Sequence, residues 1–296
     1  GNPKHLYLAE SLEYDVLYSL AEQFRGFKEI VGIGGGKVAD IAKFIHWKQG
    51  ARLYQIPTIL SVDAFFTHEI AVREQGKVTY VGDAVPEVVI VDYAIISTAP
   101  IQLNRFGIGD ILSCHTGLYD WRLAAANGYE PAWDEALAQK TLTLLDHVLD
   151  HVDAIRTMSE TGISILVDSL NWIGWQCFIQ HHPRFEEGSE HYFVYNLEYL
   201  TGKQFAHGQA VCLGCLISSY IQQNDVRKIE RAISDLAIPI TAASLGVTID
   251  DVRRTLETLH DFVWEKNLPY SIVHEHQLDT CMISEIMALI QKGGTQ

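Results

Sequence analysis

Positive charge is scarce in this 296-residue sequence, in which 22 lysines and arginines stand against 37 aspartates and glutamates and the formal net charge is −15. Nucleic acids and anionic membrane surfaces are bound through basic surface. We therefore expect neither as a partner. A local phosphate pocket stays compatible with the negative total, because such pockets are built mostly from backbone N–H groups.

Cysteines are few, and their number is odd: Cys114, Cys177, Cys212, Cys215 and Cys281. They are scattered and no signal peptide precedes them, so we expect reduced thiols and a cytoplasmic location. Cys212 and Cys215 match a C-x-x-C pattern within an apolar helical run. With no second cysteine pair for a zinc site, this pattern favours core packing over metal or redox chemistry.

Long apolar runs are missing too. No run reaches the roughly 18 residues that a membrane-spanning helix needs, so we expect no membrane span. Hydrophobic residues make up 48% of the chain and charged residues 20%. These shares are typical of a globular protein, and the length suits one large or two medium domains.

Three consecutive glycines lie where a short apolar run is followed by a helical pattern. The run Ile30–Ile33 predicts a buried strand, the three glycines Gly34–Gly36 allow a tight turn, and a helical pattern covers residues 38–47. The start of a helix offers N–H donors and a partial positive charge, which suit a phosphate. The alternative is a turn that only packs a helix on a sheet. The spacing is neither G-x-G-x-x-G nor a P-loop, so both interpretations stay open.

The character of the chain changes near residue 100. Before it, expected strands at 6–8, 30–33, 53–56, 77–81 and 88–91 alternate with helical patterns at 12–24 and 38–47. This alternation predicts a mainly parallel, doubly wound α/β sheet. After it, the patterns are helical, at 101–127, 133–156, 161–181, 190–200, 207–224, 226–237, 249–262 and 280–291. We expect an α/β dinucleotide-binding domain at 1–99, an all-helical domain for metal and substrate at 100–296, and a cleft between them.

Two loops of the first domain should lie side by side. The glycine turn follows one expected strand, and the segment 57–63 (PTILSVD) follows the next. Ligands of open α/β sheets gather beyond the carboxyl ends of the strands. We therefore expect both loops on one rim of the sheet.

Three positions in the helical half carry candidate metal ligands. Asp110 lies in an apolar helical context, where a carboxylate is costly unless it is paired or binds a cation, although an N-cap after Gly109 is the alternative. His191 and His207 each open another helical pattern, where a capping or core histidine is the common case. Two histidines and a carboxylate form the ligand set of several catalytic zinc sites and also suit ferrous iron. Whether the three positions converge stays open.

The glycine segment, GGGKVADIAK at 34–43, resembles the G-G-G-[KS]-x-x-D-x-A-K segment of the metal-dependent polyol dehydrogenase superfamily. That superfamily includes glycerol-1-phosphate dehydrogenases, glycerol dehydrogenases, iron-containing alcohol dehydrogenases and 3-dehydroquinate synthases. Further segments resemble those of glycerol-1-phosphate dehydrogenases, in the same order along the chain: 57–63, GDILS at 109–113, YDWRLA at 119–124, GSEH at 188–191, HG at 207–208 and PYSIV at 269–273.

This resemblance implies a dehydroquinate synthase-like fold. It also implies an NAD(P)-linked, metal-containing oxidoreductase that acts on the CH–OH group of a small polyol or polyol phosphate, and a homo-oligomer. Carried over by position, it implies Zn²⁺ or Fe²⁺ on Asp110, His191 and His207.

For the cofactor, the resemblance implies NAD or NADP held at positions that match the two loops: Gly34, Gly35, Gly36, Lys37, Asp40, Thr58 and Ser61. Asp63 would face the nicotinamide and substrate as the catalytic residue, where it orients substrate hydroxyls or relays a proton. A solvated loop acid is the alternative for this position.

Four departures from the family pattern matter. Family members begin with an extra strand–helix unit before the region equivalent to residue 6, and this chain is expected to lack it. Tyr195 stands where the family often has a second histidine, and Gln209 replaces a glutamate beside His207. The segment 64–68 (AFFTH) replaces a smaller, glycine-containing loop. Two alternatives stay open: a 3-dehydroquinate synthase-like lyase or cyclase that uses the same cofactor and metal, and a degenerate nucleotide-binding non-enzyme, which the missing unit, Tyr195 and Gln209 favour.

Overall fold

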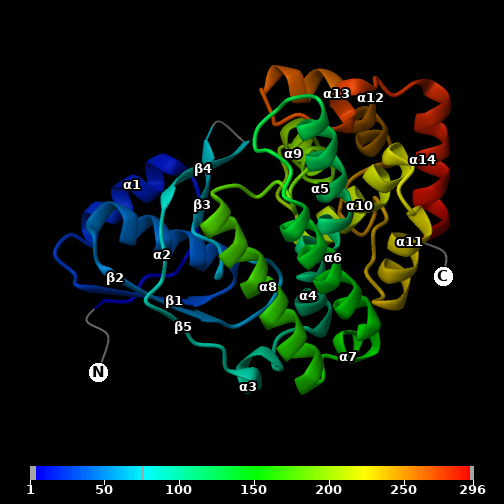
Figure 1. The fold of residues 1–296 in the computed structure, drawn as a ribbon. Coiled ribbons are helices and arrows are strands. Elements are labelled where there is room, and N and C mark those ends of the chain that lie inside the picture. The colour runs from blue at the N-terminus through cyan, green and yellow to red at the C-terminus, as the bar shows by residue number, and fades with distance from the viewer. Residues whose placement is uncertain (1–4, 75–76, 294–296) are drawn as a thin grey trace.

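The computed structural model describes residues 5–74 and 77–293, and Figure 1 shows their arrangement. The strands lie in the first third of the chain, and the helices from α3 onward form the rest. Within the described residues, no helix is both long and apolar enough to cross a membrane.

The parallel sheet has the strand order β1-β2-β5, formed by Glu29–Gly34, Arg52–Pro57 and Val88–Val89. Its register pairs Gly34 with Pro57, so β1 and β2 end side by side. Helix α2 (Gly36–Gln49) starts directly after β1 and packs on both strands. The parallel α/β arrangement agrees with the prediction from alternating strands and helices.

A separate antiparallel hairpin, β3–β4 (Glu69–Glu74 and Lys77–Asp83), departs from the sequence prediction. The expected strand at 77–81 is part of β4 and pairs with β3 instead of joining the parallel sheet. Strand β3 itself was not predicted from the sequence. The expected strand at 6–8 is absent from the described structure. Leu6 and Leu8 are 79% and 73% exposed, so these residues have no packed surface to hold a strand.

The remaining helices are α1 Tyr14–Gln23, α3 Tyr93–Ile96, α4 Ile101–Arg105, α5 Ile108–Ala126, α6 Glu135–Asp150, α7 Val152–Arg156, α8 Glu160–Gln180, α9 Ser189–Thr201, α10 His207–Gln222, α11 Val226–Asp235, α12 Ile249–Glu265, α13 Ile272–Glu275 and α14 Thr280–Gly293. The helix expected at 101–127 is divided into α4 and α5. Gly107 lies between them, where a Cβ atom would overlap the carbonyl oxygen of Leu60. The chain therefore turns where the loop that contains Leu60 crosses Gly107. The helix expected at 133–156 is likewise divided into α6 and α7 at His151.

Two large clusters of buried apolar residues hold these elements together. One joins α1 and α2 to the strands and includes Leu17, Phe44 and Leu53. The other joins the helices of the second part and includes Trp121 and Leu213. Helices α5, α9 and α10 pack on one another within this second cluster, as Figure 1 shows, and their first turns carry the site described next.

Candidate functional site

Asp110, His191 and His207 meet at one point. Each offers one ligand atom, and these atoms all lie within 4.8 Å of one another. Asp110 is in the first turn of α5, His191 in the first turn of α9, and His207 is the first residue of α10. The structure thus brings together the three positions that the sequence analysis singled out as metal ligands.

Paired glycines allow the starts of α5 and α10 to approach this closely. A Cβ atom at Gly109 would lie 2.5 Å from the Cα atom of Gly208, and one at Gly208 would overlap the carbonyl oxygen of Phe106. Asp110 follows the first glycine and His207 precedes the second. The backbone contact between the two glycines therefore sets the separation of these two candidate ligands.

The carboxylate of Asp110 is 1% exposed, and one of its oxygens lacks a hydrogen-bond partner. Its Oδ2 atom accepts a hydrogen bond of 3.0 Å from the backbone N–H of Asp63. Its Oδ1 atom lies 3.3 Å from Nε2 of His207 and accepts no hydrogen bond from the described residues. An N-cap role is wrong for Asp110, because Gly107 occupies the cap position and Asp110 lies inside the first turn. A buried oxygen without a donor is suited to a cation.

The surroundings of both histidines stabilise positive charge. Burial lowers the pKa of His191, but the hydrogen bond and charge of Glu190 outweigh it and raise this pKa to about 9. Burial also lowers the pKa of His207, and the nearby Asp110 carboxylate outweighs it, so the net direction is upward. The negative charges that raise both pKa values also attract a divalent cation, which would replace the proton on the ligating nitrogen, so the residues present fit a metal ion.

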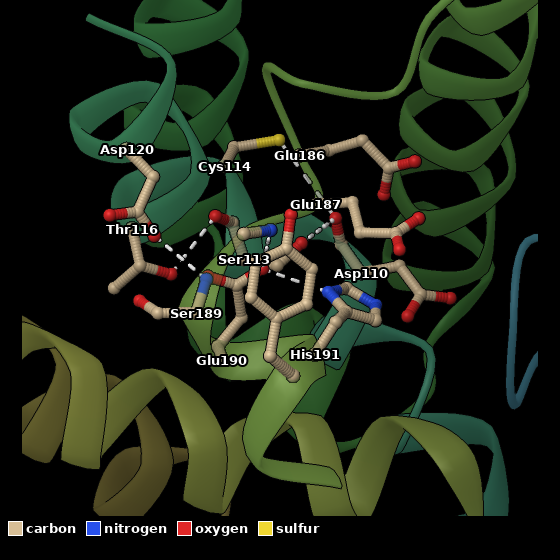
Figure 2. Close-up of polar contacts among 12 residues, drawn as sticks. Asp110, Ser113, Cys114, Thr116, Asp120, Glu186, Glu187, Ser189, Glu190 and His191 are labelled. Carbon is tan, nitrogen blue, oxygen red and sulfur yellow. Dashed lines mark hydrogen bonds and ion pairs between the residues drawn. The ribbon is translucent and has the colours of Figure 1, made fainter. Parts of the chain in front are cut away.

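Acidic and hydroxyl side chains gather around His191, where α5 and α9 meet (Figure 2). The carboxylate of Asp120 accepts hydrogen bonds from the backbone N–H groups of Ser189 at 2.7 Å and Ile272 at 2.8 Å. Burial raises the pKa of Asp120 to about 6. Asp120 therefore anchors the start of α9, the helix that carries His191.

A cavity of about 290 Å³ opens beside these ligands, between the start of α2, the β3–β4 hairpin and helices α9 and α10. Its lining includes six of the residues that the sequence analysis selected: Gly36, Lys37, Asp40, Ser61, Asp63 and His207. Among the described residues selected from the sequence, those that do not line it are Gly34, Gly35, Thr58, Asp110 and His191. The two predicted loops are neighbours, since the backbone N–H of Thr58 donates to the carbonyl oxygen of Gly34 at 2.8 Å.

The glycine turn serves packing as well as access. A Cβ atom at Gly36 would lie 2.6 Å from Cγ1 of Val62, and one at Gly34 would lie 2.5 Å from Cγ2 of Val38. The missing side chains let the loop after β2 lie close to the first turn of α2. The packing interpretation is confirmed. The phosphate interpretation stays a prediction, with the start of α2 at the cavity.

Asp40 has a structural partner that the sequence did not reveal. Its carboxylate lies 3.0 Å from the ammonium group of Lys43 and accepts a hydrogen bond of 3.2 Å from the backbone N–H of Ala71. Lys43, 1% exposed, also donates to the backbone carbonyl of Glu69. Burial raises the pKa of Asp40, and Lys43 partly offsets this. Asp40 thus ties α2 to β3 while it lines the cavity.

Asp63 lines the cavity, and its backbone N–H donates to the candidate ligand Asp110. It is partly exposed, and burial together with the Asp110 carboxylate raises its pKa well above the ordinary value. Two further acids, Glu69 and Glu187, lie nearby, where burial and the charge of Glu187 raise the pKa of Glu69 to about 7. Neither acid stands in a sequence pattern that indicates a site.

Tyr195, noted in the sequence as a departure, faces a partner from the hairpin. Its hydroxyl donates to Oε1 of Glu187 at 2.8 Å and lies 3.2 Å from the hydroxyl of Tyr80. Both tyrosines line the cavity. Where the family often has a second histidine, this chain therefore places a phenol group that is hydrogen-bonded to an acid.

Comparisons with known proteins agree with this arrangement. A sequence model described as iron-containing alcohol dehydrogenase matches residues 4–100. Glycerol-1-phosphate dehydrogenase [NAD(P)+] of Hyperthermus butylicus is 31% identical over 249 residues, which cover 84% of this chain and 70% of that protein. The protein of the same name from Sulfolobus acidocaldarius is 31% identical over 266 residues, which cover 90% of this chain and 74% of its own length.

Solved structures share the fold. A probable glycerol dehydrogenase from Sinorhizobium meliloti 1021 superposes with a TM-score of 0.72 at 22% identity, over 98% of this chain and 84% of its own. Glycerol dehydrogenase from Schizosaccharomyces pombe gives a TM-score of 0.70 at 17% identity, over 98% and 76%. At these identities the likeness shows the fold alone. The sequence relatives and the matching sequence model establish that the chain belongs to the iron-containing alcohol dehydrogenase family.

Proposed function

We propose that the chain is a metal-dependent, NAD(P)-linked oxidoreductase that acts on the CH–OH group of a small polyol or polyol phosphate. One observation carries this proposal. Asp110, His191 and His207 converge, and His207 joins this cluster to a cavity that also reaches the start of α2 behind the glycine turn. The relatives named glycerol-1-phosphate dehydrogenase [NAD(P)+] support both the substrate class and the cofactor.

The three convergent residues would hold Zn²⁺ or Fe²⁺. A divalent ion held there would supply Lewis-acid chemistry: it would polarise an alcohol or carbonyl oxygen and favour hydride transfer to or from a nicotinamide. Three protein ligands leave a coordination position open to substrate. Asp110 contributes the buried oxygen that has no hydrogen bond among the described residues.

The remaining candidate residues would bind and orient the cofactor and the substrate. The backbone N–H groups at the start of α2, at Gly36 and Lys37, would hold the pyrophosphate of NAD or NADP, as the first turn of a helix favours an anion. Gly34, Gly35, Thr58 and Ser61 shape the two loops beside it. Asp63, which lines the cavity and donates to Asp110 from its backbone, would orient a substrate hydroxyl by hydrogen bonding.

The test is a turnover assay on protein of known metal content. Purified protein is loaded with Zn²⁺ or Fe²⁺, and the oxidation of NADH and NADPH is followed with dihydroxyacetone phosphate and with dihydroxyacetone. We expect bound metal near one ion per chain and turnover of at least one ketone. Replacing a ligand, as in His207→Ala, should lower both metal content and turnover by about 100-fold or more, since even an outer-shell partner contributes 10–100-fold.

His147→Ala is the matched control, because His147 is an exposed histidine on α6, outside the cavity lining. It should leave metal content and turnover unchanged. Absence of turnover with both phosphorylated and plain polyols, in either direction, would refute the proposed activity. Release of phosphate from a sugar-derived phosphate without net change in NADH would indicate synthase chemistry instead.

Three expectations from the sequence stay predictions. These are the division into a dinucleotide-binding domain at 1–99 and a helical domain at 100–296, a cytoplasmic location, and assembly into a homo-oligomer. Free thiols at Cys114, Cys177 and Cys212 are compatible with a reducing compartment. Sedimentation of the purified protein measures the assembly state directly.

A further inference from the structure

We propose that Glu190 is a positioning residue of the metal site: it fixes the ring of His191 with Nε2 as the ligand atom, and it supplies the second negative charge that balances a divalent ion. This inference rests on the proposed function in one respect, since it requires a cation on Asp110, His191 and His207. Its test separates the two.

The first argument is the hydrogen bonding of Glu190. Its Oε1 atom lies 2.8 Å from Nδ1 of His191 and also accepts a hydrogen bond of 2.5 Å from the backbone N–H of Gly188. Because a carboxylate oxygen accepts, Nδ1 keeps its proton, and Nε2 is the ring nitrogen that can give up its proton to bind a metal. Because Gly188 holds the carboxylate from the backbone, the His191 ring is fixed in rotation as well as in tautomer.

The second argument is burial. Glu190 is 0% exposed, and its backbone is covered by α10 at Gly214, where a Cβ atom would lie 2.9 Å from the carbonyl carbon of Glu190. Among the described residues, its ion pair is with His191 alone, and its Oε2 atom has no hydrogen-bond partner. A carboxylate in such a place is costly unless a cation compensates its charge.

The third argument is charge balance. Asp110 is also buried, and among the described residues its ion pair is with His207 alone. Each of the two candidate histidine ligands is thus paired with one buried carboxylate, and no lysine or arginine among the described residues pairs with either acid. A divalent ion that displaced the protons of both imidazoles would take over the balance of these two charges. Glu198, a buried glutamate on the same helix, differs because Arg73 pairs with it at 3.0 Å.

The experiment compares Glu190→Gln with the control Glu198→Gln. The change at position 190 keeps the size of the side chain and an oxygen that can accept from Nδ1, but it removes the charge. Zinc affinity is measured by competition with a chromophoric chelator, and the visible spectrum of Co²⁺-loaded protein reports the ligand geometry. We expect Glu190→Gln to lower zinc affinity about 10- to 100-fold. Glu198→Gln should change it less than about threefold, since its charge is paired with Arg73.

Glu190→Ala removes the acceptor as well as the charge. It should lower zinc affinity further than Glu190→Gln and shift the Co²⁺ spectrum, whereas Glu190→Gln should largely keep the spectrum. Thermal unfolding of the metal-free variants identifies any that fail to fold, and Glu190→Gln, which conserves volume, carries the test in that case.

Wild-type zinc affinity in a folded Glu190→Gln variant would overturn this inference and leave the proposed function in place. An equal loss in Glu190→Gln and Glu198→Gln would also overturn it, because the effect would then be one of net charge. If the wild-type protein bound no zinc, iron or cobalt, both this inference and the proposed function would fail.

Discussion

Replacing Gly109 with alanine tests whether a backbone contact between helices sets the metal site. A Cβ atom at this position would lie 2.5 Å from the Cα atom of Gly208. Non-bonded carbon atoms normally lie about 3.5–4.0 Å apart, so the starts of α5 and α10 must separate by about 1 Å. Asp110 and His207 are the sequence neighbours of these two glycines and would move with them.

The expected loss follows from the tolerance of metal coordination. Ligand distances in a working site vary by only about 0.2 Å, so a displacement of about 1 Å removes one ligand in effect. We expect Gly109→Ala to lower zinc affinity by on the order of 100-fold. The strain of the added methyl group should also lower the free energy of unfolding of the metal-free protein by about 1–3 kcal/mol.

Chelator competition and thermal unfolding measure these two effects separately. Gly162→Ala is the matched control, because a Cβ atom there would lie 2.8 Å from the backbone nitrogen of Ile155, at a contact between α7 and α8 that holds none of the three ligands. It should lower stability and leave zinc affinity unchanged. Wild-type zinc affinity in Gly109→Ala would refute the idea that the glycine contact sets the site.

Two further predictions concern stability. Burial lowers the pKa of His274 from its ordinary 6.5 to about 4 in the folded protein. Between these two pH values the unfolded chain binds a proton that the folded protein does not bind. The free energy of unfolding should therefore fall by about 2 kcal/mol as pH drops from 6.5 to 4. His274→Gln keeps an acceptor for the backbone N–H of Ser271 but cannot take up this proton. Urea unfolding at several pH values should therefore show a smaller loss of stability between pH 6.5 and 4 in this variant. A loss equal to that of the wild type would contradict the role of His274. Lys43→Met leaves the buried carboxylate of Asp40 without its cation and should lower the free energy of unfolding in urea by about 3 kcal/mol. Adding Asp40→Asn should recover part of this loss. Equal stability of the wild type and Lys43→Met would contradict the prediction.

Local patterns predicted the elements best where one face of an element is buried. The strand that ends at Gly34 and the helix after it follow from an apolar run, a glycine turn and helical spacing, and the structure confirms both. The strand expected at 6–8 was wrong, because an apolar pair does not form a strand without a partner to pack on. Strand β3 was missed although its hairpin pairing with β4 is local, whereas the contact between Ala71 and Asp40 joins residues 31 positions apart.

The candidate site shows the same division. The sequence supplied the donor types and their places at the starts of helical patterns, but an acid in a first turn is equally suited to capping. Only the fold separates these roles for Asp110, because it places Asp110 beside His207. The Asp40–Lys43 pair is local, since the two residues are three positions apart on one helix. The sequence analysis gave Glu190 no role. Its position directly before the candidate ligand His191 was the signal that could have indicated one.

By itself, the sequence determined the negative charge, the alternating first part, the glycine turn and an ordered set of metal-binding side chains that resembles one superfamily. These are properties of composition, periodicity and order, and short segments carry them. Tertiary structure alone decided which side chains meet. Asp110, His191 and His207 converge because helix starts far apart in the chain pack through Gly109 and Gly208, and that contact depends on backbone surfaces that no local pattern encodes.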